Sequence, residues 1–225
     1  MTTVLIATRN RHKVEEIKSV LGNDFNFLTL DEFPGAPPVV EHAADFAGNA
    51  TKKAVVLAHW IASTGNPRRV ENVLADDSGL EVDALNGAPG VHSARFAALD
   101  SGAPGNSPDA ANNAKLLKLL AGTPDAKRRG RFRCVIAFTP VPDEPRRGAS
   151  PVCEADEAEV ATQLFDGTCE GKILEAPRGT HGFGYDPLFV PDGFDETFAE
   201  LGEDTKNLIS HRSRALQRLR ERLRR

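Results

Sequence analysis

The chain is poor in cysteine. Only Cys134, Cys153 and Cys169 occur among its 225 residues. Their odd number and the absence of C-x-x-C spacing argue against a disulfide framework and against a zinc site. We expect the three side chains to be reduced and to act as small apolar residues.

Long apolar runs and an excess of positive charge are also missing. No apolar stretch approaches the ~20 residues that span a bilayer, and no charged leader precedes the apolar segment at Thr3. The formal net charge is −4, so no positive field favours a nucleic acid polymer, and the arginines from 212 to 225 are expected on a terminal helix. This composition predicts a globular cytoplasmic protein that binds neither a membrane nor a nucleic acid polymer.

Aromatic residues are scarce as well, at 6% with a single tyrosine, yet they gather between residues 183 and 189. There Phe183 and Tyr185 alternate with glycines, Asp186 precedes a proline, and Phe189 follows. A flat ring at this position can stack on a nucleobase while the carboxylate accepts from its edge. The alternative is a glycine-rich hairpin whose rings lie in the core.

Two adjacent acids, Asp76 and Asp77, end an apolar strand and are followed by Ser78 and Gly79. Neighbouring carboxylates raise one another's pKa unless a cation or a donor lies between them. Mg²⁺ binds through one or two carboxylates and shares its other positions with water and substrate phosphate. The alternative is a solvated turn that uses Asp and Ser as turn formers.

At the N-terminus, a buried-type strand runs into a polar turn and then into a helix. A strand that feeds a helix through such a turn directs free backbone N–H groups at one spot, which suits phosphate. Thr8 and Asn10 can add donors, and Lys13 lies one turn inside the helix. The alternative is an ordinary helix cap with Lys13 in solvent. The glycine spacing of a Walker loop is absent.

The segment from Lys206 to Leu216 combines an apolar helical face with Lys206, His211 and Arg212. By itself, this pattern is also typical of a solvated helix face.

Together and in this order, these segments resemble the signature blocks of the inosine triphosphate pyrophosphatase family, the HAM1-like pyrophosphatases of non-canonical purine nucleotides. The resemblance covers nearly the whole chain. It rests on these blocks: Thr8-Arg9-Asn10 with Lys13, Asp76-Asp77-Ser78-Gly79-Leu80, Gly87-Ala88-Pro89-Gly90 with Ser93-Ala94-Arg95, Phe183-Gly184-Tyr185-Asp186-Pro187, and Lys206 with Ser210-His211-Arg212.

The resemblance implies an α/β fold in one domain spanning residues 1–225: a mixed long twisted sheet with flanking helices, forming two lobes around a nucleotide cleft. It also implies an enzyme, usually a homodimer, that hydrolyses dITP, ITP and XTP to the monophosphate and pyrophosphate with Mg²⁺.

The resemblance further implies a role for each matching position. Asp77 resembles the family's general base and a Mg²⁺ ligand, and Glu41 resembles the second metal ligand. Two interpretations of Asp76 stay open: it supports the metal ligands from behind, or its side chain points elsewhere. The expected substrate-binding residues are Thr8, Arg9, Asn10, Arg11, His12, Lys13, Ser78, Phe183, Gly184, Tyr185, Asp186, Lys206, His211 and Arg212.

Two positions depart from the family pattern. Arg9 stands where most relatives have glycine, and Gly48 stands where many have glutamate. Arg9 either adds a phosphate contact or changes the shape of the loop, because glycine reaches positive φ freely and arginine does not.

Two other functions stay open. The first is a Maf-like pyrophosphatase for other modified nucleotides, which shares the polar turn and the lysine. The second is a protein that binds nucleotide without cleaving it. The Phe183 and Ser210 blocks argue against the first, and Glu41, Asp77 and Lys13 argue against the second.

Hydrophobic patterns predict the elements around these motifs. We expect strands near residues 3–7, 25–30, 72–76, 131–139 and 158–165. We expect helices near residues 10–21, 45–63, 108–120 and 205–223.

Overall fold

The structure is a computed structural model that describes residues 1–100, 102, 104–143, 159 and 161–224. Its internal contacts form two compact units. The first unit comprises Met1–Asp77, Val135–Asp166 and Leu216–Arg225, and the second comprises Ser78–Cys134 and Gly167–Ala215. Each unit is described below by itself.

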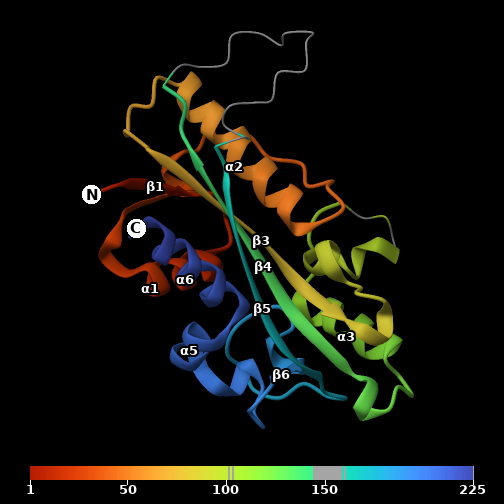
Figure 1. Ribbon diagram of the computed structural model, residues 1–225. Helices are drawn as coiled ribbons and strands as arrows, with labels where there is room; N and C mark the ends of the chain where they lie inside the picture. The colour runs from red at the N-terminus through yellow and green to blue at the C-terminus, as the bar shows by residue number, and fades with distance from the viewer. Residues whose placement is uncertain (101, 103, 144–158, 160, 225) are drawn as a thin grey trace. The chain divides into compact units, whose positions relative to one another are not determined.

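A mixed six-stranded sheet has the strand order β2-β1-β3-β4-β5-β6 (Figure 1). The bounds are β1 Thr3–Ile6, β2 Asn26–Thr29, β3 Asn72–Val82, β4 Arg129–Pro140, β5 Gln163–Ile173 and β6 Phe189–Pro191. The helices that accompany it are α1 Arg11–Leu21, α2 Phe46–Ser63, α3 Asp109–Leu119, α5 Phe198–Ile209 and α6 His211–Leu223. The α/β fold class expected from the sequence is therefore confirmed.

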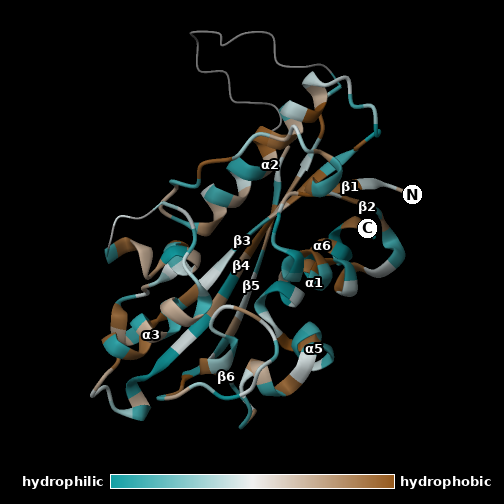
Figure 2. Cartoon of the chain, turned by 180° about the vertical axis from the view of Figure 1, so that it is seen from behind, coloured by the Kyte–Doolittle hydropathy of each residue, from teal (hydrophilic) through white to brown (hydrophobic). Residues whose placement is uncertain are grey.

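In the first unit, β1 lies between β2 and β3 and is parallel to both. Leu5 pairs with Leu28 on one side and with Val73 on the other. Parallel strands are covered on both faces, which explains why β1 is an apolar run without alternation. The helix α2 shows apolar and polar residues in turn along its length (Figure 2), and its buried residues recur at helical spacing, among them Ala50, Ala54, Leu57, Ala58 and Ile61.

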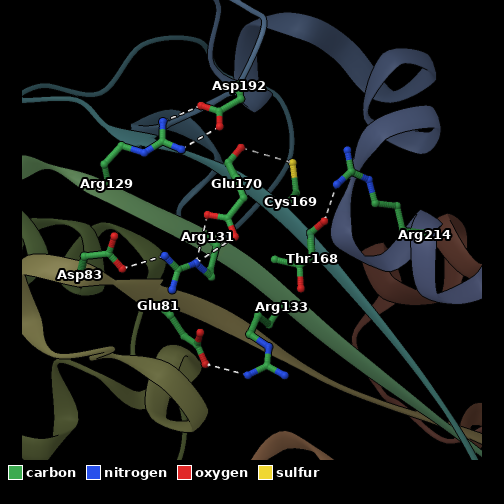
Figure 3. Close-up of polar contacts among 10 residues, drawn as sticks. All are labelled: Glu81, Asp83, Arg129, Arg131, Arg133, Thr168, Cys169, Glu170, Asp192 and Arg214. Atoms are coloured by element: carbon green, nitrogen blue, oxygen red, sulfur yellow. Dashed lines mark hydrogen bonds and ion pairs between the residues drawn. The ribbon is translucent and has the colours of Figure 1, made fainter. Parts of the chain in front are cut away.

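In the second unit, residues 129–134 of β4 alternate strictly between half-exposed and buried positions. Phe132 packs edge-on against Phe189 with ring centroids 4.8 Å apart, and it belongs to the core of the unit. The residues between the buried ones are Arg129, Arg131 and Arg133, which lie in a row along the strand, each with an acidic partner (Figure 3). One face of this strand is therefore core and the other is a charged surface.

Three expected elements differ from the structure. The strand expected at 72–76 is too short, because β3 runs Asn72–Val82 and Asp76, Asp77 and Ser78 lie within it and not in a turn after it. The strand expected at 158–165 is placed too early, because β5 runs Gln163–Ile173; residues 158 and 160 lie outside the described residues. The single helix expected at 205–223 is wrong, because α5 ends at Ile209 and α6 begins at His211. Ser210 adopts an extended conformation between them, and its Oγ accepts a hydrogen bond from Ser213 N at 3.2 Å, as an N-cap does.

The remaining expectations concern cysteines and membranes. Cys134 and Cys169 are buried, while Cys153 lies outside the described residues. Among the helices that the structure describes, none has both the length and the apolar character needed to cross a bilayer.

Candidate active site

The polar turn after β1 caps α1 and directs Lys13 inward. Thr8 Oγ1 accepts from Asn10 N at 3.2 Å, and Asn10 Oδ1 accepts from Lys13 N at 3.3 Å. These two bonds are the ordinary capping contacts of a helix start. Lys13 does not point into solvent, however, because its ammonium forms an ion pair with the fully buried carboxylate of Asp76.

The other residues of this turn lie on its outer side. Arg9, Arg11 and His12 are exposed. Arg9 Nη2 donates to Ala36 O at 3.3 Å, and Arg9 is not among the residues with positive φ. The turn therefore forms without the left-handed conformation that would favour glycine at this position.

Five charged side chains of the first unit form a carboxylate–lysine cluster: Lys13, Glu41, Lys53, Asp76 and Asp77. Lys53 lies at its centre. Its Nζ donates to Asp76 O at 2.6 Å and to Asp77 Oδ1 at 3.1 Å, and it is 3.4 Å from Glu41 Oε1. Two helices, the middle of β3 and the loop before α2 thus bring these charges together.

The start of α2 holds the loop that carries Glu41. Ala43 N donates to Asn49 Oδ1 at 3.0 Å, and Gly48 N donates to Asp45 Oδ1 at 2.7 Å. A Cβ at position 48 would lie only 2.7 Å from Ala43 Cβ. Gly48 therefore fits this close approach of loop and helix, and a glutamate there would require the loop to move.

The cluster carries an excess of negative charge, because its five groups are three carboxylates and two ammoniums. Burial raises the pKa of Asp77, the nearby lysines counter this, and Glu41 adds to the rise. Burial lowers the pKa of Lys53, but the surrounding carboxylates, that of Asp77 first, outweigh burial and raise it. Every nearby carboxylate raises the pKa of Lys53. The pKa of Asp77 is lowered by the two lysines but raised by Glu41 and by burial.

The donor set of this cluster fits a hard divalent cation. Asp77 Oδ2 is buried and has no hydrogen-bond partner among the described residues, and buried oxygens of this kind call for an explanation. No group of three or more His, Cys, Asp or Glu side chains forms a ready-made metal site in the described part of the chain. Mg²⁺ does not require one, because it is bound through one or two carboxylates and substrate phosphates.

In the second unit, a buried cation lies beside the Phe183 ring. Lys206 Nζ donates to Asp186 Oδ2 at 2.6 Å and is 4.7 Å from the Phe183 centroid. Asp186 Oδ2 also accepts from Phe183 N at 2.9 Å. Gly182 has φ +76, and a Cβ there would lie 2.2 Å from Asp186 Oδ2, so this turn closes only around a glycine.

The start of α6 adds two more of the expected residues. Arg212 is 1% exposed, its Nη2 donates to Ser78 Oγ at 2.9 Å, and its Cζ lies 5.9 Å from the Phe183 centroid. His211 is also buried and stacks on Phe132 with centroids 4.8 Å apart. Both side chains therefore point into the second unit and do not belong to a solvated helix face. Phe183, Asp186, Lys206, His211 and Arg212 are called the aromatic–cation cluster below.

Tyr185 lies deeper than a surface ring would. It is 3% exposed, belongs to the core of the second unit, and its hydroxyl donates to Ser93 O at 2.9 Å. Gly184 is held by Asp109 and Asn113, for which the sequence pattern predicted no role. Nothing in the local sequence indicates that contact, because α3 is more than 70 residues away along the chain.

Fold and side chains thus define an α/β protein with a buried carboxylate–lysine cluster and an aromatic–cation cluster. A family model described as the Ham1 family matches residues 4–222, and the chain belongs to this family.

Relatives named as pyrophosphatases are similar to this chain over nearly their whole length. The chain is 46% identical over 219 residues to a dITP/XTP pyrophosphatase of Desulforamulus reducens, which covers 97% of this chain and 94% of that protein. It is 45% identical to a dITP/XTP pyrophosphatase of Geobacter sulfurreducens, covering 99% and 97%.

Solved structures agree with the fold. A HAM1 protein from Coxiella burnetii superimposes with a TM-score of 0.76 at 35% identity, covering 99% of this chain and 98% of that chain. The Staphylococcus aureus Ham1 protein gives a TM-score of 0.75 at 34% identity, with the same coverage.

Proposed function

We propose that this protein is a Mg²⁺-dependent nucleoside triphosphate pyrophosphatase that cleaves dITP, ITP and XTP to the monophosphate and pyrophosphate. The names of its relatives support the reaction and the substrate class. The observation that carries the chemistry is the buried Asp77, whose Oδ2 has no hydrogen-bond partner among the described residues and which lies beside the Lys53 ammonium. Such a carboxylate is suited to hold a cation or to accept a proton.

In this proposal the carboxylate–lysine cluster serves the triphosphate. Glu41 and Asp77 would hold Mg²⁺, which would supply positive charge to the phosphate oxygens. Asp77 orients a water and accepts its proton during attack on the α-phosphorus, and pyrophosphate leaves. Lys13 and Lys53 stabilise the charge that spreads over the phosphoryl oxygens, where positioning and electrostatics provide most of the catalysis.

The aromatic–cation cluster serves the base. A 6-oxopurine presents an acceptor at O6 where adenine presents an amino group, so a fixed donor distinguishes the two. His211 and Arg212 are the donors that we assign to this task. Guanine presents the same acceptor at O6, so its exclusion depends on its 2-amino group.

Removal of such nucleotides from the pool is the cellular role that we propose, in the cytoplasm and as a homodimer. The Maf-like alternative and a purely binding role have no support from a specific contact of this structure.

The deciding experiment incubates the purified protein with Mg²⁺ and a panel of triphosphates, and it measures pyrophosphate and orthophosphate separately. We expect kcat/KM for ITP, dITP and XTP to exceed that for ATP at least about a hundredfold, as one mispaired buried polar group can impose. GTP, whose base also presents O6, should be cleaved slowly because of its 2-amino group. Equal cleavage of ATP, or release of orthophosphate first, would refute the assignment.

The metal is tested in the same assay. We expect excess EDTA to abolish cleavage of ITP and added Mg²⁺ to restore it, because Glu41 and Asp77 alone add no positive charge to the triphosphate. The Glu41→Gln variant should need more Mg²⁺ for half its maximal rate, while Glu32→Gln, a half-exposed control outside the cluster, should not. Full activity in EDTA would contradict the metal site.

A further inference from the structure

The turn that carries Phe183 is held from outside by one helix of the same unit. Gly184 N donates to Asp109 Oδ2 at 2.6 Å, and Gly184 O accepts from Asn113 Nδ2 at 3.0 Å. Asp109 and Asn113 are four residues apart on α3 and therefore share a face of that helix. One helix face thus binds both polar groups of a single residue of the turn.

Backbone groups in a turn need partners, and those partners determine which shape is stable. Gly184 has φ 63, a left-handed conformation. Inside the turn, Asp186 N donates to Phe183 O at 3.2 Å, and Asp186 Oδ2 accepts from Phe183 N. Outside it, the polar groups of Gly184 are bound by α3, so the direction of the preceding residue, Phe183, depends on that helix.

The helix α3 is itself well anchored. Leu116 is completely buried in the core of the second unit. Asn112 Oδ1 accepts from Ala97 N at 2.8 Å, and Asn112 Nδ2 donates to Ala94 O at 3.3 Å. Because these contacts fix α3, the side chains on its surface can hold the turn in one position.

The stability of α3 alone does not explain both contacts with Gly184. An acid at the first helical residue interacts favourably with the helix dipole without any further partner, which would account for Asp109 alone. It does not account for Asn113, whose Oδ1 is buried and has no partner in the part of the chain that the structure describes. An asparagine that leaves an acceptor unsatisfied while donating to Gly184 O indicates that this donor bond matters.

We propose that Asp109 and Asn113 are positioning residues that fix Gly184 and thereby orient the Phe183 ring beside Lys206 for the substrate base. The inference rests on the proposed function for the identity of that base. The support of the turn by α3 is independent of it. Neither residue touches substrate in this proposal, so their loss acts on base binding before it acts on the chemical step.

Four variants test the acceptor at position 109 and the donor at position 113 independently. Asp109→Ala and Asn113→Ala remove one bond each, and Asp109→Asn keeps an acceptor. Asn113→Asp exchanges the donor for an acceptor that repels Gly184 O. Lys118→Ala, on the exposed last turn of the same helix, is the control.

The first readout is steady-state kinetics with ITP and Mg²⁺. We expect Asp109→Ala and Asn113→Ala to raise KM about three- to tenfold with kcat changed less than about twofold, the effect of one hydrogen bond. Asp109→Asn should restore the wild-type KM, while Asn113→Asp should not. The double alanine variant should raise KM by less than the product of the single effects, because both bonds hold one residue.

The second readout is hydrogen–deuterium exchange of the segment from 183 to 186, measured without nucleotide. Exchange should accelerate in the two alanine variants and stay at the wild-type rate in Asp109→Asn and Lys118→Ala. Unchanged exchange in the alanine variants would overturn the proposal, and so would faster exchange with an unchanged KM. If the wild-type protein cleaves none of the triphosphates while exchange responds as expected, the proposed function fails and the support of the turn by α3 stands.

Discussion

At the scale of single residues, Asp77 combines burial, a lysine partner and an oxygen without a partner among the described residues. In Asp77→Asn the shape of the side chain is kept, but the proton acceptor and the anionic metal ligand are lost. We expect kcat with ITP to fall at least about a hundredfold, the lower range for loss of a general base. Nucleotide affinity, measured by calorimetry with Mg²⁺, should change far less.

The control for this variant is Asp31→Asn, which alters an exposed acid of the same unit. Its kinetics should match those of the wild type. A kcat near normal in Asp77→Asn would remove Asp77 from the chemistry and would make Asp76, the buried partner of Lys13, the next residue to test.

Single residues also show what the sequence could and could not reveal. The position of Lys13 followed from local pattern, because a helix start determines where such a side chain lies. Asp77 was expected at the end of a strand but lies inside β3, because two adjacent acids interrupt the apolar run without ending the strand. The depth of Tyr185 did not, since an aromatic next to glycine is equally compatible with a surface and with a core. The central place of Lys53 between Glu41 and Asp77 depends on contacts between segments that are distant in the sequence.

At the scale of elements, neighbouring residues of β4 differ in role: one packs in the apolar core and the next carries surface charge. Phe132 packs against Phe189 and His211, whereas Arg131 forms ion pairs with Asp83 and Glu170 at the surface (Figure 3). We expect Phe132→Ala to lower the free energy of unfolding by about 3–5 kcal/mol. Arg131→Ala should lower it by less than about 1 kcal/mol, because exposed pairs gain little over their hydrated ions.

Urea unfolding followed by circular dichroism measures both variants. If Phe132→Ala does not fold, Phe132→Leu keeps most of the volume and should still lose more stability than Arg131→Ala. Equal losses for the two positions would contradict the assignment of core and surface to the two faces of β4.

The elements were predictable where one local rule dominates. The bounds of α1 and α2 agree with the sequence because Asn10 and Asp45 are capping residues that precede an apolar helical pattern. The break at Ser210 was missed because the apolar pattern continues across it, and a serine signals a helix start only if the chain bends there. The part of β5 beyond residue 165 was missed because it includes small residues such as Gly167 and Gly171, which give no clear periodicity.

At the scale of the whole molecule, buried ionisable groups make stability depend on pH. Burial raises the pKa of Cys169 from 9.0 to about 11, and burial followed by the charge of Asp109 raises the pKa of Tyr185 above its ordinary value. Both groups are neutral in the folded protein at pH 9. The unfolded chain therefore releases protons at a lower pH than the folded one.

The sign of the effect follows from this order. A group whose pKa is higher in the folded state contributes stability that is complete below its unfolded value and is lost as the pH rises through its folded value. For Cys169 the window extends from about pH 9 to about pH 11, and the full loss amounts to at most about 3 kcal/mol. We therefore expect the free energy of unfolding to fall steadily between these limits.

The measurement compares wild type with Cys169→Ala by urea unfolding at pH 8, 9, 10 and 11. Lysines titrate in the same range, but they do so in both proteins, so the difference between the two curves isolates the thiol. The substitution also removes packing in the core, which shifts the whole curve by a constant amount and leaves its slope with pH unaffected. We expect the stability of Cys169→Ala to fall less steeply above pH 9, so that the two curves converge. Parallel curves up to pH 11 would show that the thiol ionises equally well in the folded protein, and that the packing around Cys169 on β5 is looser than its 2% exposure indicates.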